Sequence, residues 1–199
     1  MLRRLGLVCV SIVAAALIVL LGIRLWPRQT PQGQPPLVRL SSIEPIRQAF
    51  NAATDRTRVV ALLSPTCGTC IAGATELGRR LATRSTVPVT TLVVWMPVIL
   101  TDIAAPTSAR LALIADARAQ QFWDPDHLVS TAILSLAHQH VDRLSADQRD
   151  LLEGAPVAWD LVASFPPGVQ WASELPWPSF WGFPVVGAVD DLVAPWSPG

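Results

Sequence analysis

The sequence contains no tyrosine and no lysine, only three cysteines, and no surplus of either charge. Its fifteen basic residues are balanced by fifteen acidic ones, so it lacks the cationic excess with which proteins bind nucleic-acid phosphates. Three cysteines are too few for a disulfide framework, and a chain of 199 residues buries enough apolar surface to fold without one. The composition therefore predicts one globular domain and argues against a nucleic-acid partner.

Apolar residues are abundant instead, at 51% of the chain against 15% charged residues. An uncharged, mostly apolar run begins at Leu5, directly after Arg3 and Arg4, and continues to Ile23. With an extension to Leu25 it reaches the length of about 20 residues that a helix needs to cross the hydrocarbon core of a bilayer. A cleaved signal peptide is the alternative, but the run is long and no small-x-small cleavage site follows it. We expect a single transmembrane anchor.

The charges beside this run give only a slight preference for its orientation. Arg3 and Arg4 precede it, whereas Arg24 and Arg28 follow it, and basic residues favour the cytoplasmic side. A span so close to residue 1, followed by a long body, is the usual arrangement for exporting that body. We expect a single-pass membrane protein whose domain is extracytoplasmic, on the periplasmic side if the source is bacterial.

Behind the anchor, the hydrophobic pattern predicts alternating helices and strands, and thus an α/β fold. Residues 58–64 form an apolar run that is rich in β-branched residues and too short for a buried helix, so we expect a buried central strand there. Ser145 and Gln148 have the spacing of a capping box. The further expected elements are strands over 88–95 and 111–115, helices over 43–53, 117–123, 127–140 and 145–152, and a hairpin that joins 157–165 to 169–171.

Two cysteines, Cys67 and Cys70, follow the predicted central strand and open a helix. The free backbone N–H groups and the dipole at a helix N-terminus favour a thiolate over a thiol, which marks Cys67 as a nucleophile. Cys70, one turn further on, is placed to attack a mixed disulfide at Cys67 and to release the partner. The pair predicts thiol:disulfide exchange with a protein substrate, with Cys67 attacking and Cys70 resolving, and no cofactor is required.

A buried strand, a CxxC motif that opens a helix, further α/β units and a Gly-x-Pro sequence before a hairpin together resemble the thioredoxin superfamily. The resemblance extends over residues 58–171 and implies a thioredoxin-like three-layer sandwich. The order of the predicted parts, with an anchor before the domain, also resembles that of the membrane-tethered thiol:disulfide proteins of bacterial cell envelopes. In that family a cis proline stands beside the CxxC and the residue before it pairs with substrate. The resemblance assigns these two positions to Pro156 and Ala155.

Two further residues are candidates for contact with the substrate. Thr66 stands where the family usually has an aromatic residue before the first cysteine. Trp95 ends the second predicted strand and is a candidate to cover Cys67 in place of that aromatic residue, although packing in the core is an equal alternative. Gly68 and Thr69 replace the Gly-Pro of thioredoxin itself, so neither the redox potential nor the partner is carried over.

A non-catalytic assembly or metal-handling module is the competing class. Zinc would require the two cysteines and two of the three histidines, His127, His138 and His140. Thioredoxin-like copper proteins use two cysteines and a distant histidine, but their cysteines are usually spaced CxxxC. The chain also has no second CxxC and no cluster of Met or His. We therefore predict no metal site.

The chain divides by composition into four segments. The last is rich in Trp and Pro and lacks the periodicity of a final helix, so it either wraps around the sheet or forms an exposed docking surface. The predicted segments are a transmembrane anchor (1–26), a Pro-rich extended tether (27–40), a thioredoxin-like domain (41–172) and a Trp/Pro-rich C-terminal extension (173–199).

Overall fold

The computed structural model describes residues 14–15 and 29–196. Apart from Ala14 and Ala15, the predicted anchor from Leu5 to Leu25 lies outside these residues. No helix among the described residues is long and apolar enough to cross a membrane. The elements are β1 (Val38–Arg39), α2 (Glu44–Ala52), β2 (Thr57–Leu63), α3 (Gly68–Ala82), β3 (Val89–Trp95), α4 (Ser108–Leu111), η1 (Ala112–Ile114), β4 (Ala119–Trp123), α5 (Leu128–Gln139), η2 (Val141–Arg143), α6 (Ala146–Leu152), β5 (Leu161–Phe165), β6 (Phe180–Gly182), α7 (Val185–Val193) and η3 (Ala194–Trp196).

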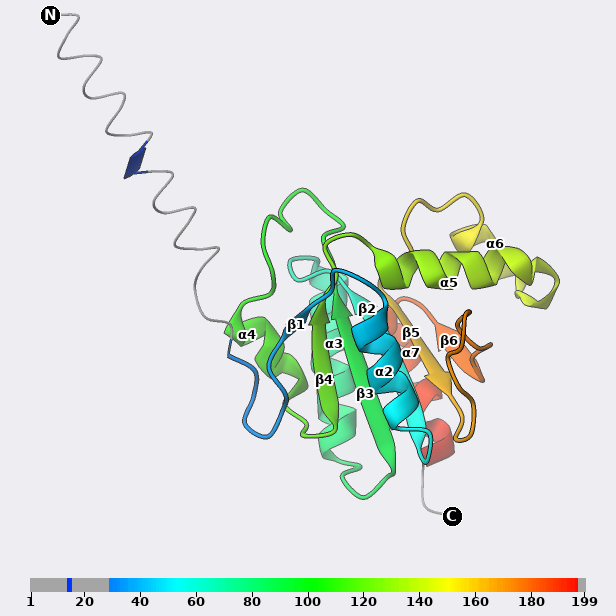
Figure 1. The fold of residues 1–199 in the computed structure, drawn as a ribbon, viewed down its shortest axis with the longest axis horizontal. Helices are drawn as coiled ribbons and strands as arrows, with labels where there is room; N and C mark the ends of the chain where they lie inside the picture. The colour runs from blue at the N-terminus through cyan, green and yellow to red at the C-terminus, as the bar shows by residue number, and fades with distance from the viewer. Residues whose placement is uncertain (1–13, 16–28, 197–199) are drawn as a thin grey trace, which may run out of the picture.

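These strands form one mixed six-stranded sheet in the order β1-β4-β3-β2-β5-β6 (Figure 1). The strands β1, β4, β3 and β2 are parallel, whereas β5 is antiparallel to β2 and pairs in turn with antiparallel β6. The strand that precedes the CxxC is therefore central. Its neighbours are β3 on one side and β5 on the other, and its central position confirms the expectation from the sequence.

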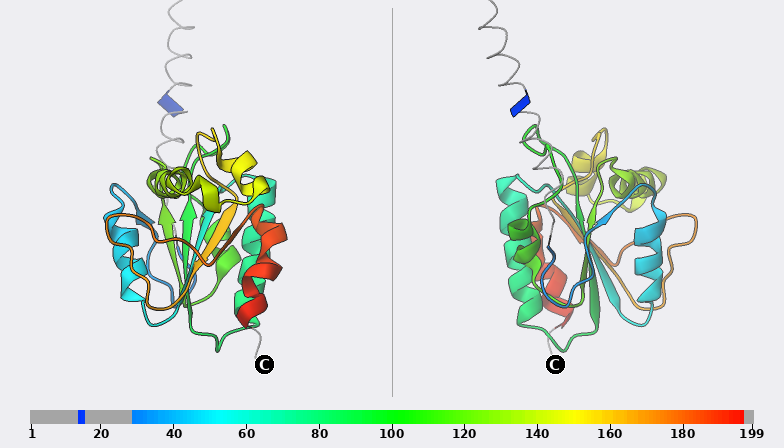
Figure 2. Two further views of the ribbon diagram at one scale, coloured as in Figure 1. Left: turned by 90° about the vertical axis from the view of Figure 1, so that its right-hand side faces the viewer. Right: turned by 60° about the vertical axis from the view of Figure 1, so that its left-hand side comes forward.

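Helices cover both faces of the sheet, which confirms the three layers (Figure 2). The period of two along β2 explains this, because successive side chains point to opposite faces. Val60 and Leu62 pack with α2 and α5, whereas Val59 and Ala61 pack with α3 and α7. Every residue of β2 after Thr57 is buried, as expected for a central strand.

The third parallel strand lies later in the chain than predicted. Of residues 111–115, expected as a strand, the first four belong to α4 and η1, and residues 117–123, expected as a helix, contain β4. The strand was missed because it contains a polar residue, Gln121, where a buried strand usually has an apolar one. Gln121 is fully buried, and its side chain is hydrogen-bonded. Its side-chain N–H donates to the Leu111 carbonyl (2.9 Å), and its side-chain oxygen accepts from the Trp95 indole (2.9 Å).

The C-terminal region is part of the sheet rather than an extension of it. Residues 169–171 form no strand, and β5 pairs instead with β6, so the predicted hairpin partner was wrong. Helix α7 was not predicted, although its buried Val185, Ala188, Val189 and Leu192 have helical spacing. Of the two alternatives for this region, wrapping around the sheet is the one observed, because Trp171 and Trp181 are buried in the core. The predicted boundary at residue 173 therefore divides one domain.

The predicted tether also belongs largely to the domain. The backbone N–H of Gln29 donates to the Ser108 hydroxyl (2.9 Å). The side-chain amide of Gln34 donates to the carbonyls of Ile114 (2.5 Å) and Asp116 (2.9 Å). Strand β1 then joins the edge of the sheet beside β4. Residues 29–40 thus lie along the domain instead of extending away from it.

Candidate functional site at the cysteine pair

The CxxC motif lies at the carboxyl end of the central strand β2, where the chain turns into α3. Cys67 is the N-cap residue of α3, with extended backbone angles, and Cys70 lies in the first turn. Both cysteines are free thiols in this structure. The predicted strand-CxxC-helix arrangement is confirmed.

Cys67 is partly exposed, and its environment favours the thiolate. Its sulfur lies 3.1 Å from the Thr69 hydroxyl oxygen. Partial burial raises the pKa of Cys67, but hydrogen bonds from the Cys70 backbone N–H and from the hydroxyl and backbone of Thr69 lower it more, and the net shift is downward. A helix N-terminus thus provides the donors that a sulfur anion needs.

Cys70 has the opposite environment. It is fully buried, and burial is the largest cause that raises the pKa of its thiol well above the ordinary value. The charges of Asp160 and of ionised Cys67 raise this pKa further. The two thiols therefore differ in character: one is accessible and acidic, and the other is buried and protonated.

The carboxylate of Asp160 reaches this site from the residue directly before β5. Asp160 is buried and has a positive φ of 50°, a conformation that is uncommon for a residue other than glycine. One of its carboxylate oxygens accepts from the backbone N–H of Val185 at the start of α7 (3.1 Å). The site thus contains a buried acid that is close enough to Cys70 to affect its ionisation.

A second buried carboxylate, Asp102, holds the segment that leads into Cys67. It accepts from the Ser64 hydroxyl (2.7 Å) and from the Thr66 backbone N–H (3.1 Å) and hydroxyl (2.6 Å). The Ser64 oxygen in turn accepts from the Cys67 backbone N–H (3.1 Å). Burial raises the pKa of Asp102, but backbone and hydroxyl donors lower it more, so it stays ionised. The network fixes the approach to the nucleophile.

Ala155 and Pro156 lie in an apolar groove of about 530 Å³ near the site. Asp160 and Trp159 line the same groove, which connects it to the surroundings of Cys70. The expected cis bond at Pro156 was wrong, because the cis peptide among the described residues precedes Pro184, another residue of this groove. Pro156 precedes β5 by five positions, so Asp160 occupies the place next to the strand that the resemblance gave to the proline.

Of the other two predicted contacts, Thr66 is at the surface and Trp95 is not. Thr66 is exposed beside Cys67, and its hydroxyl also contacts that of Thr101. Trp95 has no exposed surface, and its indole N–H donates to buried Gln121. Core packing, the alternative for Trp95, describes its position, since a substrate on the protein surface does not touch it.

The three histidines do not gather around the cysteines. His127 contacts the Pro97 carbonyl through its ring, and the His140 ring packs edge-on against Trp177. Within residues 29–196, no three His, Cys, Asp or Glu side chains are grouped so as to hold a metal ion.

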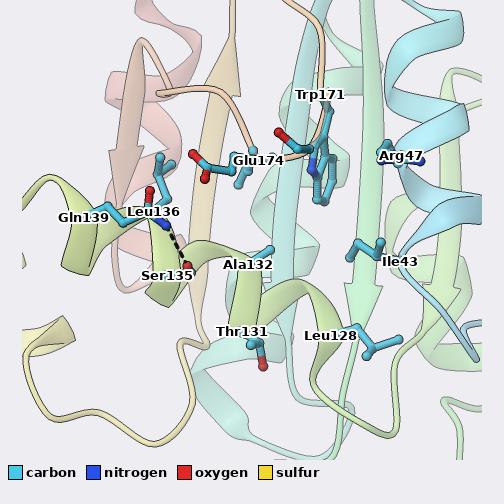
Figure 3. Close-up of a pocket in the computed structure, with 12 residues that line it drawn as sticks. Ile43, Arg47, Leu128, Thr131, Ala132, Ser135, Leu136, Gln139, Trp171 and Glu174 are labelled. Carbon is cyan, nitrogen blue, oxygen red and sulfur yellow. Dashed lines mark hydrogen bonds between the residues drawn. The ribbon is translucent and has the colours of Figure 1, made fainter.

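A second cavity, of about 260 Å³, lies between α2 and α5 (Figure 3). Ile43 and Arg47 line it on the α2 side, and Leu128, Ala132 and other residues line it on the α5 side. Neither the cysteines nor Asp160 line this cavity, so it forms no part of the thiol site.

The sequence pattern did not predict the roles of Ser64, Asp102 and Asp160. Asp102 had one signal, since it is the only ionisable residue in an otherwise uncharged loop over 96–109. Asp160 stands inside an apolar segment, directly before a strand. Neither signal gives the distance in space to a cysteine.

No protein-family model matches this chain, and no curated protein matches it. Among solved structures, a match is the solution structure of a thioredoxin-like protein in the oxidised form, at 14% sequence identity and a TM-score of 0.43. It covers 71% of this chain and 78% of that one. A match of this size says nothing about substrate or mechanism, and the proposals below depend on the geometry of this chain.

Proposed function

We propose that this protein exchanges disulfides with another protein, with Cys67 as the nucleophile and Cys70 as the resolving thiol. The observation that carries the proposal is the contrast between the two thiols at the start of α3. Cys67 is accessible and has a lowered pKa, whereas Cys70 is buried and has a raised one. Such a difference suits a pair in which one thiol attacks first and the other waits.

In the reducing direction, the Cys67 thiolate attacks one sulfur of the partner's disulfide. The partner's S–S bond breaks, a mixed disulfide forms at Cys67, and the first partner sulfur leaves as a thiolate. Cys70 then loses its proton, its thiolate attacks the Cys67 sulfur, and the second partner sulfur leaves. The partner gains two electrons, and this chain ends with a Cys67–Cys70 disulfide. The oxidising direction reverses these steps.

The proton on Cys70 must leave before the second step. Asp160 is the buried carboxylate whose charge acts on this thiol, so it is the residue best placed to receive the proton. The apolar groove that contains Ala155 and Pro156 is also lined by Asp160, the carboxylate whose charge acts on Cys70, and it gives the partner a place to lie. Thr66, exposed next to Cys67, would border the bound segment.

The proposal includes attachment to a membrane through residues 5–25, with the domain on the extracytoplasmic side. The length of the uncharged stretch from Leu5 to Ile23 supports it. A compartment that permits disulfides suits the chemistry of a CxxC pair.

Trapping tests the exchange. A Cys70→Ser variant cannot resolve the mixed disulfide, so it should accumulate partner-linked species through Cys67 in cells that express the chain at native levels. Non-reducing gels should show these species, and reductant should remove them. A Cys67→Ser variant is the matched control, because it keeps the other thiol of the pair but lacks the nucleophile. Complete absence of adducts in the Cys70→Ser variant would contradict the proposal.

A further inference from the structure

The loop between β3 and α4 presents three apolar side chains to solvent. Leu100 is 99% exposed, Ile103 is 68% exposed and Ile99 is 39% exposed. Single exposed apolar residues are common on protein surfaces, but three within five positions form a patch of the kind that marks a contact with a membrane or a protein.

This patch has no accessible charge and is firmly held. Across residues 96–109 the only ionisable side chain is Asp102, which is buried. Its carboxylate accepts from the backbone N–H groups of Val98 (2.8 Å) and Ile99 (3.0 Å), and its own N–H donates to the Ile99 carbonyl (2.9 Å). The protein thus uses a buried acid to fix a turn whose tip is Leu100. A fixed turn keeps these side chains at the surface instead of letting them fold back into the core.

The start of the described domain lies beside this loop. Gln29 is hydrogen-bonded to Ser108, five residues after Ile103. The uncharged run ends at Ile23, so the chain between Ile23 and Gln29 spans at most roughly 20 Å. In Figure 1 the loop rises from α4 at the same edge of the sheet. An anchor in the bilayer would therefore hold this edge of the domain close to the lipid.

We propose that Ile99, Leu100 and Ile103 contact the bilayer surface to which the domain is anchored. The inference rests on the membrane attachment in the proposed function. Lipid suits an apolar tip without accessible charge, since removing such side chains from water is favourable. Arg110 at the base of the loop, whose guanidinium donates to the Pro65 carbonyl, adds a cation that lipid phosphates would attract.

The contact determines where the reactive thiol lies. Thr101, in the same loop, contacts Thr66 through their hydroxyls, and Thr66 precedes Cys67. Ile99 also lines the apolar groove that contains Pro156. A loop seated in lipid thus holds Cys67 and its groove at the membrane surface, which favours partners whose disulfide lies close to the bilayer.

Spin labelling of the full chain tests the lipid contact without using the redox activity. The chain, with Cys9→Ser, Cys67→Ser and Cys70→Ser, is reconstituted in phosphatidylcholine vesicles and labelled through Leu100→Cys. The matched control label is placed through Val141→Cys, because Val141 is also an exposed apolar residue (44%) but lies in η2, beyond the far end of α5. Collision rates with oxygen, which concentrates in lipid, are compared with those of a water-soluble nickel complex.

The label at position 100 should collide more with oxygen than with nickel, and the label at position 141 should show the reverse. Adding Ile99→Asp and Ile103→Asp should move the label at position 100 into water. That result would show that the side chains of the loop, and not the label itself, make the lipid contact. A position-100 label as open to nickel as the control would overturn the proposal. If Ile103→Asp then still lowered trapped adducts in cells, the patch would belong to a protein partner. A chain that fails to float with the vesicles would overturn the attachment itself, whereas failed trapping alone would leave the lipid contact standing.

Discussion

At the scale of single residues, the lowered pKa of Cys67 depends partly on one hydroxyl. The Thr69 oxygen lies 3.1 Å from the Cys67 sulfur and is one of the donors that lower the pKa of this thiol. A hydrogen bond to the charged form favours that form. The motif therefore uses its second middle residue for activation, whereas a Gly-Pro motif has no hydroxyl at this position.

We expect Thr69→Val to raise the pKa of Cys67, because it removes the hydroxyl and keeps the shape of the side chain. The thiolate reacts and the thiol does not, so the pH profile of alkylation by iodoacetamide should move to higher pH. The variant should react several times more slowly near neutral pH. It should react at the wild-type rate at a pH high enough to ionise Cys67 in both proteins. Thr69→Ser keeps a hydroxyl and is the control. Identical profiles for wild type and Thr69→Val would show that the backbone donors alone activate Cys67.

The candidate site was only partly predictable at this scale. Cys67 and Cys70 were found because their chemistry is encoded in local spacing. Asp102 and Asp160 were missed because they come from far along the chain, through tertiary contacts that have no local pattern. Asp102 holds Ser64 and Thr66 ahead of Cys67, and the charge of Asp160 acts on Cys70. Trp95 was left open between two positions for a related reason, since a strand-end aromatic residue is compatible with both the surface and the core until Gln121 is seen to satisfy its indole.

At the scale of elements, Gly78 in α3 and Gly187 in α7 differ in how closely other atoms approach them. A β-carbon on Gly78 would lie 2.1 Å from the carbonyl oxygen of Leu113, a backbone atom of η1 that cannot turn away. A β-carbon on Gly187 in α7 would meet no atom within 4 Å. The first glycine permits close contact between α3 and η1, and the second has no such role.

Opposite effects on stability are therefore expected from the same substitution. Gly187→Ala should stabilise the protein by about 0.5–1 kcal/mol, because alanine is the better helix former and nothing obstructs it. Gly78→Ala gains the same propensity but must displace a backbone segment, and we expect a net destabilisation of about 2 kcal/mol. Denaturant unfolding of both variants measures the two values. A Gly78→Ala protein as stable as wild type would show that η1 moves aside freely.

The elements that the sequence predicted correctly are those with a strong local pattern. Strands β2 and β3 each end in a run of five or four apolar residues, and α6 begins with the predicted capping box between Ser145 and Gln148. Strand β4 was missed because its polar Gln121 is buried and satisfied by side chains that the sequence does not place nearby. Helix α7 was missed because Trp and Pro on both sides of it hid nine residues of regular spacing.

At the scale of the whole molecule, residues 29–40 are fixed to the domain instead of forming a flexible spacer. Gln34 lies in a chain of side-chain hydrogen bonds that reaches the core, since its oxygen accepts from Gln121 (2.8 Å), which in turn accepts from Trp95. The Pro-rich segment was predicted as a tether from its composition, which describes how such a segment behaves alone. It does not reveal that one glutamine fixes the segment to the sheet.

The last prediction concerns this attachment: residues 5–25 stay on the mature protein and cross the membrane, with the domain outside. The run approaches the length of a full span, its flanks carry arginine on both sides, and no small-x-small site follows it. In a bacterial host, the full chain should remain with the membrane fraction after an alkaline wash, and sequencing should find the original N-terminus. Protease added to spheroplasts should digest the domain and leave a cytoplasmic marker protein intact.

A mature chain that begins near residue 27 would instead identify the run as a signal peptide, and a domain protected until the spheroplasts are lysed would reverse the orientation. The first result would also remove the bilayer from beside Leu100, because the short connection to Gln29 is what brings this loop to the membrane, whereas the second would place the loop at the cytoplasmic surface of the same bilayer.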